Sequence, residues 1–255
     1  MTAADRLRTA GVLLGLAAVN VTAQRTRLPS DVVVPVGVLA LAAAARASGL
    51  RTSEMGLGRA PARRGLGTAG LLATLTVAGV AAATRMPGAD GFRADQRYPS
   101  PTAARRAALT RIPLSVAVPE EVAFRGVLDA SLRRHLASPA AGAWGAVAFG
   151  AWHALGATTL GRDNDGVGRA IGTGRLGTAA AVGGAVLSTG VAGLGFLELR
   201  RRSGSVLAGV AVHWALNAAT ALAAGLRGDR TAGTCSPAHA GYSEQGDSHS
   251  SRPAT

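Results

Sequence analysis

Seven apolar runs divide the chain, and they constrain its fold more than any other feature. Aromatic residues make up only 4% of the chain, and Ala, Gly, Val and Leu supply the apolar content instead. Small residues of this kind let helix backbones approach closely, as they do in packed membrane helices. Spanning a bilayer takes about 20 apolar residues, and several of the runs are shorter. The runs are residues 11–21, 32–45, 65–83, 112–132, 140–155, 178–199 and 206–226.

This pattern predicts an all-α fold, a polytopic transmembrane bundle of about six to eight helices with the active site inside the bundle. An Ala-rich soluble helical protein is the alternative, but the repeated apolar runs favour a membrane protein. Residues 11–21 follow two arginines as in a signal peptide, yet no clean cleavage site comes after them, so we expect a retained helix. The predicted divisions are N-terminal helices and loops (1–111), a core with the polar motifs (112–226) and a disordered polar tail (227–255).

The formal net charge is +13, and arginine supplies every basic residue. A strongly basic chain is first a candidate for nucleic-acid binding. Here the arginines lie in short groups between the apolar runs, where a chain borders anionic head groups, and no nucleic-acid-binding motif is present. We therefore expect an integral membrane protein that contacts the lipid bilayer and does not bind nucleic acid. Cys235 is the only cysteine, so neither an internal disulfide nor a thiolate metal site can form.

Two adjacent glutamates and an arginine lie within the apolar run 112–132. Ionised groups in such surroundings cost several kcal/mol unless they are paired or hydrated. Glu121 and Arg125 are four residues apart, so they share a helix face and can form an ion pair. Glu120 points about 100° away from that face and could act as a general base. A buried salt bridge with a second glutamate at a helix start is the structural alternative.

Two histidines occupy later apolar runs. His153 ends the pattern F-x-x-x-H that begins at Phe149, and His213 begins the pattern H-x-x-x-N that ends at Asn217. Either histidine could simply form a hydrogen bond between helices. Together with Glu120, however, these side chains could converge from three helices to activate water or to bind a divalent metal. A transporter or channel could use the same residues as a proton relay.

The motifs E-E-x-x-x-R, F-x-x-x-H and H-x-x-x-N, in this order and each in an apolar segment, resemble those of the CPBP intramembrane proteases. That family includes the CAAX prenyl proteases and the Abi group of bacteriocin-processing and self-immunity enzymes. The resemblance covers residues 112–226 and implies an endopeptidase that hydrolyses a peptide bond of a membrane-associated protein or peptide. A catalytically silent immunity or scaffold protein of the same fold remains the alternative.

The resemblance also implies a role for each motif residue. Glu120 would be the general base that takes a proton from water, and His153 would help to hold that water. His213 and Asn217 would stabilise the oxyanion that forms on the substrate carbonyl. The other two residues of the first motif would organise its helix, and they are Glu121 and Arg125.

The cofactor remains open between zinc and none. Glu120, His153 and His213 could bind zinc and leave a fourth position for water, which would make the chain a metalloprotease. The spacing H-E-x-x-H is absent, and the three ligands would come from three helices, so we favour direct activation of water by the glutamate.

Location and substrate are inferred from composition. The composition is typical of a high-GC bacterium, so we expect the bacterial plasma membrane. Prenylated CAAX proteins are mainly a eukaryotic substrate class, and a bacterial membrane protein or peptide is therefore the expected substrate. The polar segments 85–111 and 156–177 are the candidate docking loops, and residues 102–111 could form a short amphipathic helix.

Overall fold

The structure, a computed structural model, describes residues 2–87, 89, 95–172 and 174–234. Within these residues the fold is helical, without strands, and one isolated bridge pairs Asp95 with Asn164. The predicted all-α class is therefore confirmed. Helix α11 (Val206–Thr234) continues beyond residue 226, where the polar tail was expected to begin. The rest of that tail, residues 235–255, lies outside the described part of the chain.

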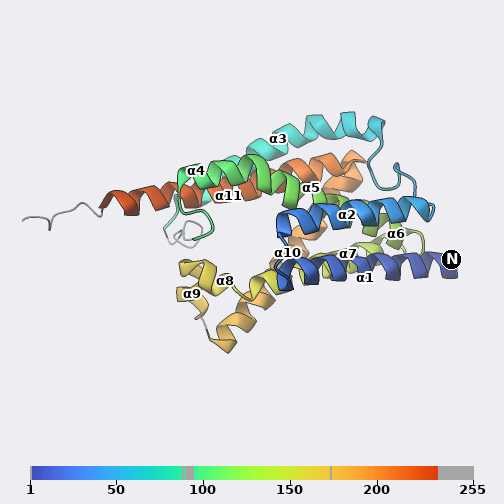
Figure 1. The fold of residues 1–255 in the computed structure, drawn as a ribbon. Coiled ribbons are helices and arrows are strands. Elements are labelled where there is room, and N and C mark those ends of the chain that lie inside the picture. Colours follow the sequence, from blue (N-terminus) through green and yellow to red (C-terminus); the bar gives the residue numbers. More distant parts are fainter. Residues whose placement is uncertain (1, 88, 90–94, 173, 235–255) are drawn as a thin grey trace, which may run out of the picture.

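The long helices correspond to the apolar runs, each extended by residues at its ends (Figure 1). The Thr2 side chain caps the first helix by accepting a hydrogen bond from the Asp5 N–H. Gly204, with φ of 72°, takes the left-handed conformation that ends α10. Besides α11, the long helices are α1 (Ala3–Arg25), α2 (Ser30–Ala47), α3 (Arg59–Ala83), α7 (Ser138–Ala157) and α10 (Arg175–Ser203).

The first motif lies in one continuous helical stretch, residues 101–133, which we call the motif helix. Pro113 does not break it, because the Val118 N–H reaches five residues back to the Pro113 carbonyl. Pro119 also lies inside the stretch, in the three-residue α-helical segment between the two π-helical ones, and it does not end the helix either. π-Helical turns are rare in proteins overall, and those that occur are often found at functional sites. The parts are α4 (Pro101–Arg106), π-helical η2 (Ala107–Ala117), α5 (Val118–Glu120), π-helical η3 (Glu121–Leu128) and α6 (Asp129–Arg133).

The segment 156–177, expected to be a loop, contains two short helices, α8 (Leu160–Asp163) and α9 (Asp165–Ile171). Asn164 separates them, and its side-chain oxygen accepts a hydrogen bond of 3.1 Å from the Val167 N–H. This is the usual N-cap interaction of asparagine, and it explains why a second helix begins there.

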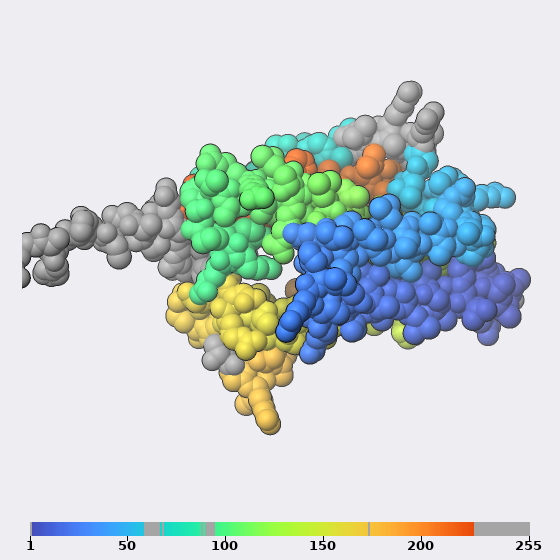
Figure 2. Space-filling model, viewed as in Figure 1, coloured from blue at the N-terminus to red at the C-terminus, as the bar shows by residue number. Residues whose placement is uncertain are grey.

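The motif helix is at the centre of the packing. It contacts α1, α2, α7, α10 and α11, while α7 lies along α10 and α11 lies along α3 (Figure 1). The apolar core joins Leu16 of α1, Val38 of α2, Phe124 and Leu128 of the motif helix, and Phe149 of α7. Figure 2 shows a hollow on one face, where the N-terminal helices, the green motif helix and the yellow α8–α9 pair meet.

The outer surface of the bundle is apolar. Leu39 of α2, Trp144 of α7 and Leu187 of α10 are each at least 60% exposed. Among the described residues, three helical segments are long and apolar enough to cross a membrane, judged by length and composition: α2, α10 and residues 206–226 of α11. Such side chains would be a liability in water but are the normal lipid-facing surface of a membrane bundle.

Close packing of α7 on α10 should make Gly150 intolerant of a side chain. A Cβ atom at Gly150 would lie 2.5 Å from the Val186 carbonyl oxygen, so the helices would have to separate. We predict that Gly150→Ala lowers the free energy of unfolding by about 1–3 kcal/mol, measured by thermal unfolding in detergent. Gly145→Ala, on the same helix with open space around it, should leave stability unchanged or raised. Equal effects of the two substitutions would contradict the prediction.

Candidate active site

Glu121 is a fully buried carboxylate that an arginine and a histidine contact. Its Oε1 lies 3.1 Å from Arg125 Nη1, one turn further along the motif helix, and 3.1 Å from His213 Nδ1 of α11. The four-residue spacing between Glu121 and Arg125 predicted their ion pair. The contact with His213 was not predicted, because it depends on how α11 packs against the motif helix. Gly209 of α11 lies directly against this carboxylate, and an added Cβ would overlap Oε2. The absence of a side chain there lets α11 bring His213 within reach.

Aromatic rings and a carbonyl hold the Arg125 guanidinium. Its Cζ lies 3.9 Å from the ring centroid of Phe149 and 5.0 Å from that of Phe196. Nη2 donates to the Gly193 carbonyl at 3.4 Å. The contact of Nη1 with Glu121 is an ion pair without hydrogen-bond alignment, because Nη1 has no hydrogen-bond partner among the described residues. Charge and cation–π attraction together therefore connect the motif helix to α7 and α10.

Glu120 faces groups from α7 and α11 rather than a cation on its own helix. Trp152 Nε1 donates to Oε1 at 3.1 Å. The second oxygen, Oε2, lies 3.8 Å from Nε2 of both His153 and His213. That separation is too long for a direct hydrogen bond, and Oε2 has no hydrogen-bond partner within the described chain. One oxygen of Glu120 is thus anchored, and the other is available.

Hydrogen bonds determine which ring nitrogen carries the proton in each histidine. His153 Nδ1 lies 2.9 Å from the Phe149 carbonyl, which can only accept, so Nδ1 carries the proton. His213 Nδ1 faces the Glu121 carboxylate and is a donor for the same reason. In its neutral form each ring therefore turns an unprotonated Nε2 toward Glu120. Glu120 Oε2 and the two Nε2 atoms are then all hydrogen-bond acceptors, and a water molecule between them could donate to two of the three.

Rings also orient the imidazoles. Phe196 stacks on His213 with 5.0 Å between centroids, and Phe149 meets the His153 ring edge-on at 4.8 Å. The side chain of His153 is 28% exposed, against 9% for Glu120, so the site opens on the His153 side. Asn217 lies one turn after His213 on α11, is half-buried and makes no side-chain hydrogen bond among the described residues.

The side chains Glu120, His153 and His213 do not fit zinc as they are arranged. Among the described residues, no three His, Cys, Asp or Glu side chains are placed to hold a metal ion. Zinc bonds of 2.0–2.1 Å put neighbouring tetrahedral ligands about 3.3 Å apart, which is shorter than the 3.8 Å between Glu120 Oε2 and each Nε2. No step below therefore involves a metal.

The fold brings together six of the seven residues that the motifs define, Phe149 included, and it places Asn217 on the adjoining turn. Sequence reasoning gave no role to Trp152 or Phe196. Trp152 lies inside the second motif next to His153, so its position was a usable signal. Phe196 belongs to no motif, and only the packing of α10 shows that it contacts both Arg125 and His213.

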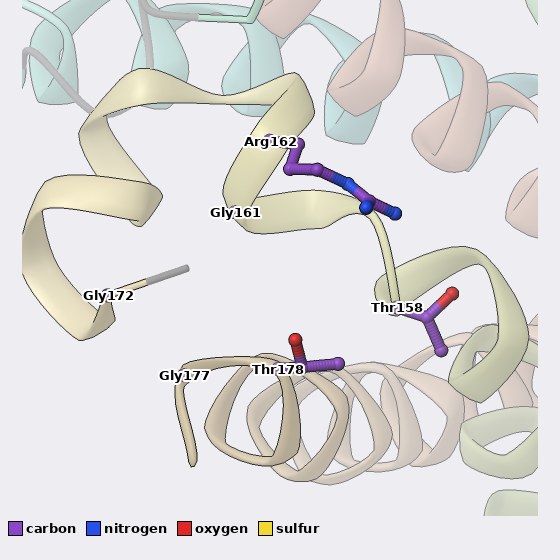
Figure 3. A pocket seen from close by; sticks show the side chains of 6 residues that line it. All are labelled: Thr158, Gly161, Arg162, Gly172, Gly177 and Thr178. Atoms are coloured by element: carbon purple, nitrogen blue, oxygen red, sulfur yellow. The ribbon is translucent and has the colours of Figure 1, made fainter. Parts of the chain in front are cut away.

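A separate cavity of about 230 Å³ lies among α7, α8, α9 and the start of α10 (Figure 3). Its lining contains no motif residue and no acid–base pair, so it does not compete as a catalytic centre. Its lining residues are Thr158, Gly161, Arg162, Gly172, Gly177 and Thr178.

Comparison with known families gives a match over residues 103–219, to the family described as type II CAAX prenyl endopeptidase Rce1-like. The matched segment contains all three motifs, and the match confirms the resemblance to the CAAX and CPBP proteases. Searches of curated proteins and of solved structures found no match to the chain.

The buried ion pair should contribute far more to stability than its exposed counterpart. Arg125→Ala leaves Glu121 buried without its cation, and we predict a loss of about 3–5 kcal/mol in the free energy of unfolding. Arg202→Ala removes an ion pair of the same i, i+4 order, with Glu198, whose side chains are 80% and 50% exposed. That substitution should change stability by less than about 1 kcal/mol. Thermal unfolding of both variants in detergent is the measurement, and similar small losses would show that Arg125 is dispensable.

Proposed function

We propose that this chain, whose residues 103–219 belong to the type II CAAX prenyl endopeptidase Rce1-like family, cleaves its substrate with a water molecule activated by Glu120. The family and the apolar helices together make the chain an integral membrane protein of the intramembrane endopeptidase type. Which residues act, and how, is our proposal.

The free oxygen of Glu120 carries this proposal. It is buried, lacks a hydrogen-bond partner among the described residues and lies 3.8 Å from Nε2 of both His153 and His213. A water molecule between these atoms could donate to Glu120 and to one imidazole. A carboxylate and a water in this relation are the elements of general-base catalysis.

The reaction then follows from the positions of the protons. Glu120 takes one proton from the water while the water oxygen adds to the carbonyl carbon of the scissile peptide bond. The protonated Glu120 next gives that proton to the leaving nitrogen, and the C–N bond breaks. Trp152 keeps the Glu120 carboxylate oriented through both steps, because its N–H donates to the oxygen that does not exchange the proton.

The oxyanion formed on the carbonyl requires hydrogen-bond donors. Asn217 can supply them, since its amide carries two N–H groups in every protonation state. His213 could add a donor from Nε2 only with both ring nitrogens protonated, because Nδ1 already donates to Glu121. Glu121 and Arg125 act as positioning residues in this scheme, because they hold His213 and the motif helix without touching the substrate.

We further propose a bacterial plasma membrane as the location and a membrane-associated protein or peptide as the substrate. The Ala-, Gly- and Arg-rich composition supports the first, and the protease family supports the second. The exposed side of His153 is the side from which such a substrate would approach.

Glu120→Gln should abolish cleavage without unfolding the protein. Glutamine keeps the size of the side chain and can accept the Trp152 hydrogen bond, but it cannot take a proton from water. Purified wild-type protein and the variant, in detergent or liposomes, would be compared on a labelled peptide library. We expect a loss of at least about 100-fold, in the range that general bases contribute.

Glu198→Gln is the matched control, because Glu198 is an exposed glutamate of α10 outside the site. It should cleave at the wild-type rate. Equal cleavage by wild type and Glu120→Gln would exclude Glu120 as the base. A Glu120→Gln variant that keeps the full cellular phenotype would instead favour the silent scaffold.

Removing metal ions should leave cleavage intact. The three candidate ligands do not fit zinc, and the proposed mechanism needs only protein side chains and water. Activity would be measured after dialysis against a chelator, beside a zinc endopeptidase treated in the same way. Loss of activity that added zinc restores would overturn the direct mechanism.

A further inference from the structure

A basic cavity of about 440 Å³ lies where the motif helix ends, away from Glu120 and the histidines. Its size is within the range of about 300–1,000 Å³ that is usual for small-molecule sites. The lining comes from the α2–α3 connection, from α6 and the residue after it, and from the end of α10. Its polar members are Ser53, Glu54, Arg133, Arg134, Arg200 and Arg201.

The arginines of this cavity outnumber the carboxylates that could neutralise them. Glu54 is committed to Arg134, whose Nη2 lies 2.9 Å from Oε2. That hydrogen bond holds the pKa of Glu54 below its ordinary value, so the pair is fully ionised at neutral pH. Arg133 has only a loose partner, Asp129, at 3.6 Å. Arg201 donates one N–H to a backbone carbonyl and forms no salt bridge within the described chain.

Arg200 adds an unsatisfied donor. It is 7% exposed, and its Nη2 donates to the Glu54 carbonyl at 2.9 Å. Its buried Nε has no hydrogen-bond partner among the described residues. Gly56, with φ of 69°, lies directly against the guanidinium, where an added Cβ would overlap it. This packing fixes the position of the Arg200 guanidinium, so its positive charge stays at the wall of the cavity.

The cavity adjoins the ends of candidate membrane spans. Helix α10 and residues 206–226 of α11 are candidate membrane spans, and Arg200 and Arg201 come just before the turn that joins them. The α2–α3 connection follows α2, another candidate span. Arginines that border membrane spans are attracted to the anionic surface of a bilayer.

We propose that this cavity binds a phosphate group, carried either by an anionic membrane lipid or by a phosphate-bearing solute. The planar guanidinium fork matches phosphate oxygens in pairs, and four arginines line this one space. Ser53 offers a further hydroxyl donor. The cavity is lined by none of the motif residues, so a test of phosphate binding does not depend on whether Glu120 is the catalytic base.

Arg201→Gln and Arg202→Gln are a matched pair for testing the site. Both remove one positive charge from the same helix end, but Arg202 does not line the cavity and is 80% exposed. Binding to the purified full chain would be titrated by native mass spectrometry with phosphatidylglycerol and, separately, with phosphatidylcholine. We expect phosphatidylglycerol to bind more tightly, about fivefold weaker binding in Arg201→Gln, and no change in Arg202→Gln. Arg133→Gln should weaken binding in the same way as Arg201→Gln.

Inorganic phosphate distinguishes the two sources. If it raises the melting temperature of the wild type but not of Arg201→Gln, and displaces the lipid, the site takes a free phosphate. If it does neither while phosphatidylglycerol binds, the site takes the lipid. The proposal is overturned if neither probe binds, if both lipids bind equally, or if Arg202→Gln weakens binding as much as Arg201→Gln. Melting curves of the unliganded variants show whether each is folded before binding is compared.

Discussion

The packing around the motif helix depends on the burial of one carboxylate, that of Glu121. A fully enclosed negative charge requires a cation within contact distance, and Arg125 supplies it at 3.1 Å. The arginine is buried in turn, so it needs the rings of Phe149 and Phe196 and the Gly193 carbonyl around it. Phe149 belongs to α7, and Phe196 and Gly193 belong to α10, so both helices pack against the motif helix at Arg125. The close approaches of α10 and α11 to the motif helix follow from neutralising this group.

Two neighbouring glutamates differ because of what surrounds them. Both oxygens of Glu121 are enclosed, Arg125 balances its charge, and His213 Nδ1 donates a hydrogen bond to it. Glu120, rotated to the next face, meets an indole N–H on one oxygen and two unprotonated imidazole nitrogens near the other. The first arrangement encloses an ion pair, and the second leaves one carboxylate oxygen beside two imidazoles. In the mechanism we propose, the two glutamates therefore divide a structural and a chemical role within one turn of helix.

Local patterns predicted the parts of this structure that depend on spacing along one helix. The apolar runs predicted the long helices, and the four-residue interval predicted the Glu121–Arg125 pair. The contacts of Trp152 and Phe196 escaped prediction, because they depend on how α7 and α10 pack against the motif helix. The π-helical turns escaped for a related reason. They shift the backbone register without changing residue type, so neither composition nor periodicity indicates them.

The distribution of charge along the chain has a consequence for how the protein is made. α2, α10 and residues 206–226 of α11 are apolar enough to enter a bilayer on their own, but the motif helix is not among these segments. Its ionised groups would each cost about 2.5–3.5 kcal/mol at the centre of an isolated span. Phe149, Phe196 and His213, which surround those groups, all follow it in the chain. The groups that neutralise and enclose the motif helix are therefore complete only once α7, α10 and α11 have been made.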